Sequence, residues 1–595
     1  MKTNIKFQLS LWVLMGIILF SFDGCRADLL DIAPKNAASS ENIWSSANLA
    51  EQVVTGVYNR LRNEISGANN RPMFDVMGSA TDFDYNWRGD LPFLHGGPTP
   101  SSGIYINYWR LYYEVVHRAN DVIANIDKVP DMSDALKAQR KAECKFLRAI
   151  FYYRLNVLYH GVPIYLEPVE VADCIKPRST EKEVWDVIIS DLTDCINEPN
   201  LPNKYASNNS NYGRVTKAAA YAMRGKMYLW LEDWAKAEQD FKAITAMGEY
   251  SLFGDYKTLF KVQNERCDEM IFSVQFIEQS GYGQNLTRAY GNRSTGTSDG
   301  AGAWNNYIVN PSLAETFECD DGKPFNWDDF LPGYSSMTPQ KRSVFFLRDN
   351  MTEAEITTMT NFGAEMSLYL SEGNEARIKA AYDNRDPRLR LNIITPYSIY
   401  NGGRDGSAMD YTLRWPYRNR TAPYFDVQTD TNSKFYYLGR KFVPEGREHL
   451  NMEFNPIDFP LIRYADVLLS LAEALNEQGK TTEAITYVNQ VRARVNHQLL
   501  NSNSHTTVSG QADMRQRIRN ECYYEFPFEN HTYFNELRWK TWKDKKFFPG
   551  NGMREIWGLA TYTYTWVGDQ NWTWPIPATE RQMNSNLTQN PGWID

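Results

Sequence analysis

The sequence predicts a mostly α-helical protein, built on a scaffold of tetratricopeptide-like helical repeats with a long irregular, loop-rich insertion. Three observations support this fold class. A helical hairpin is expected between residues 459 and 495, and a second hairpin near residues 218–244 repeats its spacing of small and bulky residues. Between the two hairpins, the composition changes from helical patterns to turn-forming residues.

The first hairpin reads FPLIRYADVLLSLAEALNEQGKTTEAITYVNQVRARV. Gly479 is expected to end its first helix, because glycine adopts the left-handed cap conformation without strain. Thr481 and Thr482 are then expected to cap the second helix. Apolar residues recur at helical spacing on both sides of the turn and form one stripe on each helix. They are Val467, Leu468, Leu471, Ala472 and Leu475, followed by Ala484, Ile485, Val488, Val491 and Val495.

The second hairpin reads AAAYAMRGKMYLWLEDWAKAEQDFKAI and carries the same offsets as the first. Each contains a small residue, a larger one three positions later, a small one nine later and a bulky one four later, which matches a tetratricopeptide unit. The matched sets are Gly225, Tyr228, Ala237 and Phe241, and Ala472, Leu475, Ala484 and Val488. Residues 47–62 and 137–159 are interpreted as further helices of the scaffold with looser spacing.

The N-terminus is interpreted as a secretory signal peptide covering residues 1–24. Lys2 and Lys6 precede an apolar run that is shorter than the roughly 20 residues needed to cross a bilayer. Cys25 follows Gly24 directly after this segment and is the predicted lipidation site, by which the protein would be anchored to a membrane without spanning it. An ordinary secreted protein with an incidental Cys25 is the alternative.

Residues 25–595 are interpreted as a single unit rather than a string of domains. The helical scaffold is expected over about residues 40–276 and 456–545, and the loop-rich ligand-binding region over about 277–455. Long loops in folded proteins are usually functional. The tail, 546–595, is expected to be extended, because Pro575 and Pro577 prevent a regular helix there.

Composition argues against several classes of function. The net charge is −9 and the basic residues are dispersed, which disfavours nucleic acid as a partner. Aromatic residues make up 14% of the chain, more than a helical core requires, so some are expected to be exposed for contact. The seven cysteines show no metal-ligand spacing. No cofactor and no metal site is predicted; a structural calcium ion is left open, although no stretch has EF-hand spacing.

No motif of a hydrolase, a metalloprotease or a nucleotide-binding enzyme occurs in the sequence. The adjacent acids Asp320 and Asp321, and Asp328 and Asp329, are interpreted as solvated turn residues, because glycosidase carboxylates must face each other across a cleft. The protein is therefore not expected to be an enzyme.

Taken together, the segments of the chain resemble a SusD/RagB-family outer-membrane lipoprotein, the nutrient-binding partner of a TonB-dependent (SusC-like) transporter. The order and spacing of the matching segments carry the resemblance. They are the signal followed by LLDIAPK, then YWRLYYEVVHRANDVIANID, KAECKFLRAIFYYRLNVLYHGVPIY, RSTEKEVWDVIISDL, GRVTKAAAYAMRGKMYLWLEDWAKA, FPLIRYADVLLSLAEALNEQG, IRNECYYEFPFENHTYFNELRW, and WPIP followed by QNPGW. The chain departs from the family pattern at Phe22 and Asp23, before Gly24, and in its long middle region.

The resemblance implies a scaffold of four tetratricopeptide-like units that carries a less regular ligand-binding half. It also implies a lipid-anchored, non-catalytic protein at the cell surface that captures an oligosaccharide or polysaccharide and passes it to the transporter. Arg148, Arg463 and Glu473 lie in matching segments and are expected to form buried salt bridges rather than to contact ligand.

Sugar binding calls for exposed aromatic rings beside polar side chains, since sugar rings stack their C–H faces on flat aromatics. Two segments have this composition. Residues 80–90 supply the predicted ligand residues Asp82, Tyr85, Trp87 and Arg88, and the family often places a binding tryptophan there. Residues 300–307 supply Trp304 and Tyr307, and Tyr282, Tyr290 and Trp327 are further candidates. In each case the competing interpretation is an aromatic residue packed on the scaffold.

Two other functions remain open at this stage. The chain is alternatively an assembly or peptide-binding lipoprotein of the same transporter complex, without a sugar site. A hydrolase would require facing carboxylates in the loop region. The sequence does not identify the glycan.

Overall fold

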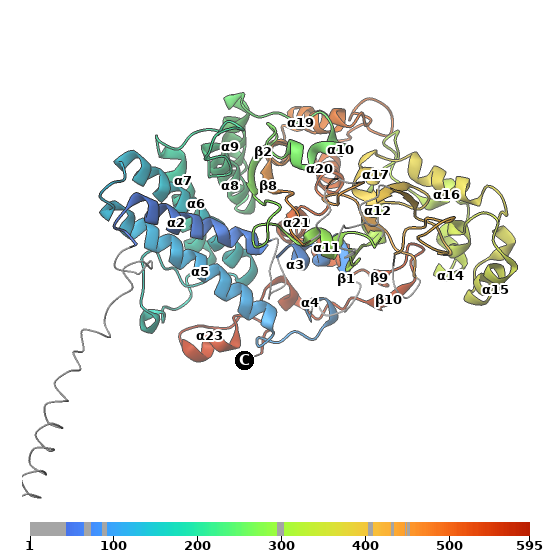
Figure 1. The fold of residues 1–595 in the computed structure, drawn as a ribbon, viewed down its shortest axis with the longest axis horizontal. Coiled ribbons are helices and arrows are strands. Elements are labelled where there is room, and N and C mark those ends of the chain that lie inside the picture. The colour runs from blue at the N-terminus through green and yellow to red at the C-terminus, as the bar shows by residue number, and fades with distance from the viewer. Residues whose placement is uncertain are drawn as a thin grey trace, which may run out of the picture.

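The structure, a computed structural model, describes residues 43–64, 73–85, 92–293, 303–402, 409–429, 434–446, 448 and 453–594. Helices that pack side by side fill one half of the molecule, and short helices, short strands and loops fill the other (Figure 1). None of the helices in the described ranges is long and apolar enough to cross a bilayer.

The helical half begins with the four longest described helices among the first two hundred residues. The packing order is α5 against α6 and α6 against α7, with α2 lying on α5 and α6. Their bounds are α2 (Ala47–Tyr58), α5 (Gly103–Asn125), α6 (Asp134–Tyr159) and α7 (Glu181–Asn197). The helices predicted at residues 47–62 and 137–159 are therefore confirmed, although a 3₁₀ turn, η2 (Asn59–Glu64), replaces the end of the first.

Both predicted hairpins are confirmed, and they stack on each other. The hairpin predicted near residues 218–244 consists of α8 (Lys217–Trp230) and α9 (Trp234–Met247), and the hairpin predicted between residues 459 and 495 contains α18 (Tyr464–Glu477) and α19 (Thr481–Arg494). Helix α18 packs against α9, α19 and α20 (Gln511–Glu525), so the array continues across the long insertion. Segments far apart in the sequence thus form one layered scaffold (Figure 1).

The turn between α18 and α19 differs from expectation in one detail. Gly479 has a φ of +77°, as a left-handed helix end requires. The N-cap of α19 is Lys480, however, and no side chain caps this end. The prediction that Thr481 or Thr482 caps the helix is therefore wrong; the Thr481 hydroxyl instead donates to the Asn476 Oδ1, 2.9 Å away.

Close approach between helices explains why a small residue is needed at the repeat position Gly225. A Cβ atom built at Gly225 would lie 2.7 Å from the ring of Phe241, closer than real Cβ contacts come. The bulky ring of α9 therefore occupies the space that the missing side chain leaves on α8. This is the packing that the matched offsets predict for a tetratricopeptide-like pair.

Gly225→Val is expected to lower the free energy of unfolding by about 1–3 kcal/mol, because the added methyl groups overpack the interface with Phe241. Urea denaturation followed by circular dichroism measures the effect. Gly254→Val is the matched control: nothing lies within 4 Å of its Cβ position, so a change of less than about 0.5 kcal/mol is expected. Equal losses in the two variants would contradict the packing argument.

A short antiparallel sheet joins the two ends of the insertion. Strand β2 (Met270–Val274) pairs with β8 (Phe459–Arg463), with Met270 opposite Arg463 and Val274 opposite Phe459. The chain therefore leaves the helical half and returns to it at neighbouring positions. The region between these strands is tethered to the scaffold at both of its ends.

The inserted region contains more helix than its composition suggested. Two helices in it are ten residues long, α15 (Glu353–Phe362) and α16 (Asn374–Asp383). The sequence does contain a signal for the start of α15, because Thr352 and Glu355 form a capping box. The remaining elements are short: α11 (Leu286–Tyr290), β3 (Tyr307–Val309), α12 (Pro311–Thr316), α13 (Trp327–Phe330), α14 (Pro339–Arg342), α17 (Arg388–Asn392), β4 (Ile393–Ile394), β5 (Ile399–Gly402), β6 (Met409–Thr412) and β7 (Leu438–Gly439).

The C-terminal segment returns to the first helices. The Trp574 backbone N–H donates to the Leu158 carbonyl at 2.7 Å, and the Asn590 side chain donates to the Tyr159 carbonyl at 2.8 Å. Much of the segment is extended, and it contains the 3₁₀ turn η9 (Asp569–Trp572) and one short helix near its end. Two helices precede the segment, α21 (His531–Trp539) and α22 (Trp542–Lys546). The segment itself contains β9 (Gly552–Arg554), β10 (Ala560–Thr563) and the helix α23 (Ala578–Met583).

A buried ionic network joins the scaffold to the inserted region. The guanidinium of Arg463 is fully buried and pairs with Glu529 at 2.6 Å and with Glu269 and Glu525 at 2.7 Å. Burial alone would raise the pKa of Glu525, but the surrounding arginines lower it below its ordinary value. The members of this network are the cations Arg388, Lys441, Arg463, Arg492 and Arg494 and the acids Glu269, Glu318, Asp386, Glu521, Glu525 and Glu529.

The salt bridges expected from sequence are confirmed. Besides the pairs of Arg463, Arg148 pairs with Asp191 at 2.7 Å, and Glu473 pairs with Arg538 at 2.7 Å. All of these groups are buried. They hold helices of the scaffold together and do not reach the surface.

Candidate ligand-binding surface

A two-stranded sheet brings the two predicted ligand segments together. Strand β1 (Phe83–Tyr85) pairs antiparallel with β3, so that Phe83 lies opposite Val309 and Tyr85 opposite Tyr307. The Asn310 N–H also donates to the Asp82 carbonyl at 3.1 Å. The segment 80–85 therefore runs beside the segment that carries Trp304, although more than two hundred residues separate them in the sequence.

Trp304 is the exposed aromatic residue of this surface. Its side chain is 45% exposed. Backbone hydrogen bonds fix the chain on both sides of it: the Trp304 N–H donates to the Arg288 carbonyl at 2.7 Å, and the Asn306 N–H donates to the Ala289 carbonyl at 2.9 Å. Asn305, at φ +58°, donates from its side chain to the Gln428 carbonyl at 3.0 Å. A ring held in this way is available for contact without the cost of ordering a loop.

Arg288 covers part of the Trp304 ring. Its guanidinium carbon lies 4.3 Å from the ring centroid, a cation–π distance. Arg288 also forms an ion pair with Glu453. The stack holds the indole against a charged, hydrogen-bonding guanidinium on one of its faces. These are the features that suit a sugar ring, an apolar face beside hydrogen-bonding groups.

A second exposed ring, Tyr282, is held by the same framework. Its side chain is 55% exposed, and the Arg62 guanidinium lies 5.7 Å from its ring centroid. The following residue, Gly283, packs so closely on the Phe454 backbone that a Cβ there would lie 2.4 Å from it. Since Phe454 directly follows Glu453, the partner of Arg288, the supports of both rings meet at residues 453–454.

The other aromatic candidates are placed in the core. Tyr290 is completely buried and packs on Phe528 with 5.3 Å between ring centroids; burial raises the pKa of its hydroxyl well above the ordinary value. Tyr307 is 5% exposed. Neither ring offers a face to a ligand, and for these two residues the structure favours the packing interpretation. Trp327 is buried as well, and its indole N–H donates to Glu315 at 2.9 Å.

Asp82 is also a structural residue. It is buried, and its carboxylate accepts hydrogen bonds from the Phe528 N–H at 3.0 Å and the Thr532 hydroxyl at 3.4 Å. Burial raises its pKa to about 6. The carboxylate thus fastens the start of β1 to the residues around the start of α21, and it does not face solvent.

Several predicted residues lie outside the described part of the chain. Trp87 and Arg88 fall in the segment 86–91, which is not described. The side chain of Tyr85 is not described either, although the backbone of this residue belongs to β1. Cys25 precedes the first described residue. What the structure adds is the position from which segment 86–91 departs, directly beside β3.

Of the acidic pairs in the inserted region, Asp320 and Asp321 lie in a turn, whereas Asp328 and Asp329 lie in the short helix α13. Asp321 accepts a hydrogen bond from the Lys323 N–H at 2.9 Å, and Asp328 accepts one from the Ser335 N–H at 3.1 Å. Asp321 is exposed and Asp328 is partly exposed. The turn interpretation is therefore confirmed for the first pair and wrong for the second, which begins a helix. Within the described ranges, no three histidine, cysteine or acidic side chains group in a way that could hold a metal ion.

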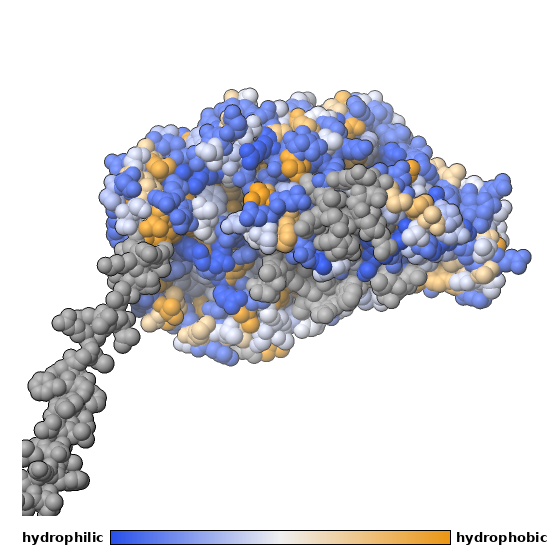
Figure 2. All heavy atoms as spheres, in the orientation of Figure 1, coloured by the Kyte–Doolittle hydropathy of each residue, from blue (hydrophilic) through white to orange (hydrophobic). Residues whose placement is uncertain are grey.

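The described surface on one face of the molecule is mostly hydrophilic. Figure 2 shows the face seen in Figure 1, where hydrophobic areas are small and scattered among polar ones. Among the described residues, Trp304 and Tyr282 are exposed rings that offer apolar contact area.

The chain is similar to known proteins over most of its length. A family profile described as "SusD family" matches residues 268–593, and one described as "Starch-binding associating with outer membrane" matches residues 28–229. The SusD-like protein P25 of Formosa agariphila is 22% identical over 537 residues, covering 88% of each chain. The starch-binding protein SusD of Bacteroides thetaiotaomicron is 23% identical over 492 residues, covering 79% of this chain and 75% of that protein.

Solved structures share the fold. A SusD-like carbohydrate-binding protein from Bacteroides fragilis superimposes with a TM-score of 0.69 at 21% identity, covering 92% of this chain and all of the other. A laminarin-binding SusD-like protein gives a TM-score of 0.61 at 20% identity, with the same coverage. At these identities, the likeness establishes the architecture, a helical scaffold with tetratricopeptide-like repeats.

Proposed function

Because the chain belongs to the SusD family, we propose that it is a cell-surface lipoprotein that captures oligosaccharide or polysaccharide and delivers it, chemically unchanged, to a TonB-dependent outer-membrane transporter. The observation that supports this function most directly is Trp304, an exposed indole fixed by its backbone and by a stacked guanidinium. Relatives of the same fold carry names that refer to starch, laminarin and other glycans.

The binding site proposed here centres on Trp304 and extends toward Tyr282 and toward segment 86–91. Trp87, Arg88 and Tyr85 remain proposed ligand residues on sequence grounds, since β1 leads from the scaffold to that segment beside β3. Tyr290, Tyr307 and Asp82 are not included, because they are buried. A sugar chain lying across separated rings would gain contact area from each of them.

Anchoring is proposed to occur through lipid on Cys25, which follows the predicted signal peptide. About twenty residues of the sequence separate Cys25 from Ala47, where α2, the first helix in the described part of the chain, begins.

Retardation in native gels that contain purified polysaccharides tests the function. The wild-type protein is expected to migrate more slowly in at least one of a broad panel of neutral and charged glycans, and isothermal calorimetry should give a Kd for the matching oligosaccharide. The same oligosaccharide, incubated with the protein and analysed by chromatography, should keep its length.

Two results would contradict the proposal. Shortened products would indicate a hydrolase. Failure to bind any glycan of the panel, together with co-purification of a transporter barrel, would favour the alternative of an assembly or peptide-binding lipoprotein without a sugar site.

A further inference from the structure

Among the described residues, three tryptophan, tyrosine or phenylalanine side chains are exposed, and an arginine lies beside each of them. Two of them, Trp304 and Tyr282, belong to the proposed glycan-binding surface. The third is Tyr424, which is 39% exposed. It lies in the inserted region, between β6 and β7, and we call residues 413–429 the Tyr424 loop. The combination of an open ring and a guanidinium therefore occurs at a third place on the molecule.

Hydrogen bonds fix the Tyr424 loop around the ring. The backbone N–H groups of Tyr424 and Phe425 both donate to the Thr421 carbonyl, at 3.1 and 3.2 Å. The Arg414 side chain donates to the Tyr424 carbonyl at 3.2 Å. The Phe425 carbonyl accepts from the Thr412 N–H of β6 at 3.0 Å. The ring is thus presented by a loop that is already fastened to a strand, and a ligand does not have to order it.

Two arginines support the ring of Tyr424. The guanidinium carbon of Arg418 lies 5.3 Å from the ring centroid and that of Arg348 lies 5.8 Å from it, both within cation–π range. Glu355 binds Arg418 at 2.8 Å. The buried Asp426 binds Arg348 at 2.9 Å. Each cation is fixed by an acid, so the ring has a rigid support, and it is still open to solvent.

Hydrogen-bonding groups lie close to this ring. The Tyr424 hydroxyl makes no hydrogen bond within the described ranges. Asn419 is exposed, and its backbone carbonyl accepts from the Asp426 N–H at 2.8 Å, which keeps it near the ring. Its side-chain oxygen accepts from the Thr421 N–H at 3.2 Å, which leaves the amide N–H groups available to a ligand. An apolar face with such groups beside it suits a sugar ring.

Two side-chain hydrogen bonds join the same loop to the chain around Trp304. The Arg420 guanidinium donates to the Arg293 carbonyl at 3.3 Å. Asn305, the residue after Trp304, donates to the Gln428 carbonyl at 3.0 Å. One contact lies before Trp304 in the sequence and the other directly after it. The two loops therefore pack on each other.

The rings of Tyr424 and Trp304 lie on adjoining loops and make no ring contact with each other. An extended chain covers at most about 3.6 Å per residue, so the four residues from Tyr424 to Gln428 span at most about 14 Å. Gln428 is bonded in turn to the neighbour of Trp304. One chain of linked sugars can therefore lie across both rings, whereas a short oligosaccharide can occupy one ring alone.

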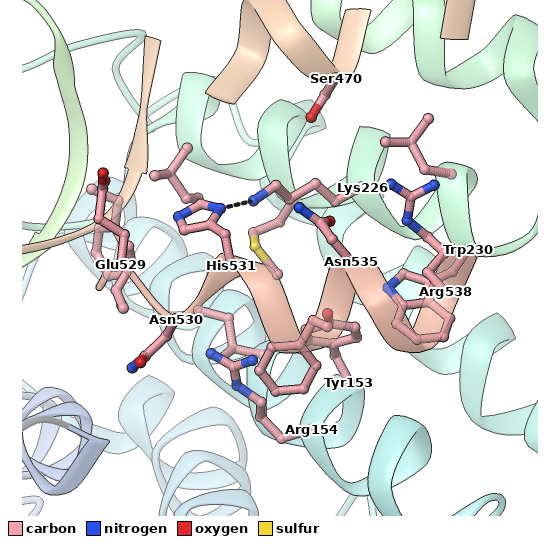
Figure 3. A pocket seen from close by; sticks show the side chains of 17 residues that line it. Tyr153, Arg154, Lys226, Trp230, Ser470, Glu529, Asn530, His531, Asn535 and Arg538 are labelled. Atoms are coloured by element: carbon pink, nitrogen blue, oxygen red, sulfur yellow. Dashed lines mark hydrogen bonds between the residues drawn. The ribbon is translucent and has the colours of Figure 1, made fainter. Parts of the chain in front are cut away.

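The pocket in the helical half, between α6, α8, α18 and α21, does not offer an alternative place for a sugar ring. Its volume is about 70 Å³, whereas a cavity of about 150 Å³ holds benzene. Figure 3 shows the side chains that line it, among which the Lys226 ammonium donates to Nδ1 of His531 at 3.3 Å. Contacts with a sugar are therefore expected at the open rings of the surface.

We propose that Tyr424 is a further stacking platform for the glycan, separate from Trp304, and that the ligand is a polysaccharide chain long enough to lie on both rings. This inference rests on the proposed glycan-binding function and adds to it the length of the ligand. One sugar of the chain stacks on Tyr424, and its hydroxyl groups bond to Asn419 and to the Tyr424 hydroxyl. Affinity should therefore increase with chain length until both rings are covered.

Binding measured as a function of chain length tests the proposal. The probes are the polysaccharide that retards the wild-type protein in native gels and the size-fractionated oligosaccharides from its partial acid hydrolysis. Calorimetry gives the affinity of each probe for the full-length mature protein and for Tyr424→Ala. The ratio of the two affinities is expected to be close to one for the shortest oligosaccharide that binds. For the polysaccharide it should be about five-fold or more, which corresponds to about 1 kcal/mol.

Two variants serve as controls. Tyr424→Phe keeps the ring and should lose less affinity for the polysaccharide than Tyr424→Ala does. Leu231→Ala truncates a residue of similar exposure, 42%, on the helical half, and should bind every probe like wild type. The unfolding temperature of each variant checks that the fold is retained.

The possible results have distinct meanings. A ratio near one at every chain length would show that Tyr424 does not contact the glycan. A ratio that is as large for the shortest oligosaccharide as for the polysaccharide would show that the ring belongs to the Trp304 site and is not a separate platform. Either result overturns the platform at Tyr424 and leaves the glycan-binding function intact. If the wild-type protein binds no glycan at all, the proposed function fails and the platform fails with it.

Discussion

Arg463→Met is expected to lower the free energy of unfolding by about 3–5 kcal/mol, because removing one partner of a buried ion pair leaves uncompensated charge behind. Three carboxylates depend on this guanidinium, those of Glu269, Glu525 and Glu529, and all are buried with it. Methionine fills much of the same volume, so loss of charge rather than loss of packing dominates the effect. Urea denaturation measures the change.

An exposed ion pair provides the control for this measurement. Arg515 pairs with Glu477 through two hydrogen bonds, at 2.5 and 2.6 Å, but its side chain is 36% exposed. Arg515→Met is expected to cost less than about 1 kcal/mol, since solvent screens such pairs. If Arg463→Met is as mild as Arg515→Met, then the network does not hold the inserted region to the scaffold.

Trp304→Ala is expected to weaken glycan binding by about thirty-fold or more, which corresponds to about 2 kcal/mol, the loss typical of a central aromatic contact. The fold should be unaffected, because the backbone hydrogen bonds of residues 304 and 306 do not involve the indole. Calorimetry with the oligosaccharide found in the gel panel gives the affinity, and the unfolding temperature checks the fold.

The controls separate a loss of stacking from a general defect. Trp304→Phe keeps an aromatic face and should retain most of the affinity. Val171→Ala alters a fully exposed apolar residue on the helical half and should change nothing. Affinity in Trp304→Ala equal to that of wild type would move the binding site away from this ring.

Much of the scaffold could be predicted from the sequence, because its signals are local. The stripe from Val467 to Leu475 and the break at Gly479 define a hairpin without reference to the rest of the chain. The matched offsets of Gly225 and Phe241 predicted a close contact between two helices, and the Phe241 ring does lie against Gly225. Helix α15 was missed although Thr352 and Glu355 marked its start, because the surrounding composition favoured loops.

The ligand surface was less predictable, because exposure depends on tertiary contacts. Trp304 and Tyr307 are three residues apart and equally aromatic, yet one ring is half-exposed and the other is buried. The difference arises from the pairing of β3 with β1, which no local pattern reports. The stack of Arg288 on Trp304 was missed for the same reason, since it depends on how α11 folds back beside the following loop.

The central claim is that a rigid helical frame presents flat rings that hold a sugar chain, and a crystal structure with the bound oligosaccharide tests it most directly. A sugar ring is expected within about 4 Å of the Trp304 indole, the contact distance of stacked apolar groups, on the side that Arg288 leaves open. Clear density for the oligosaccharide elsewhere on the molecule, with the Trp304 ring free, would contradict the account.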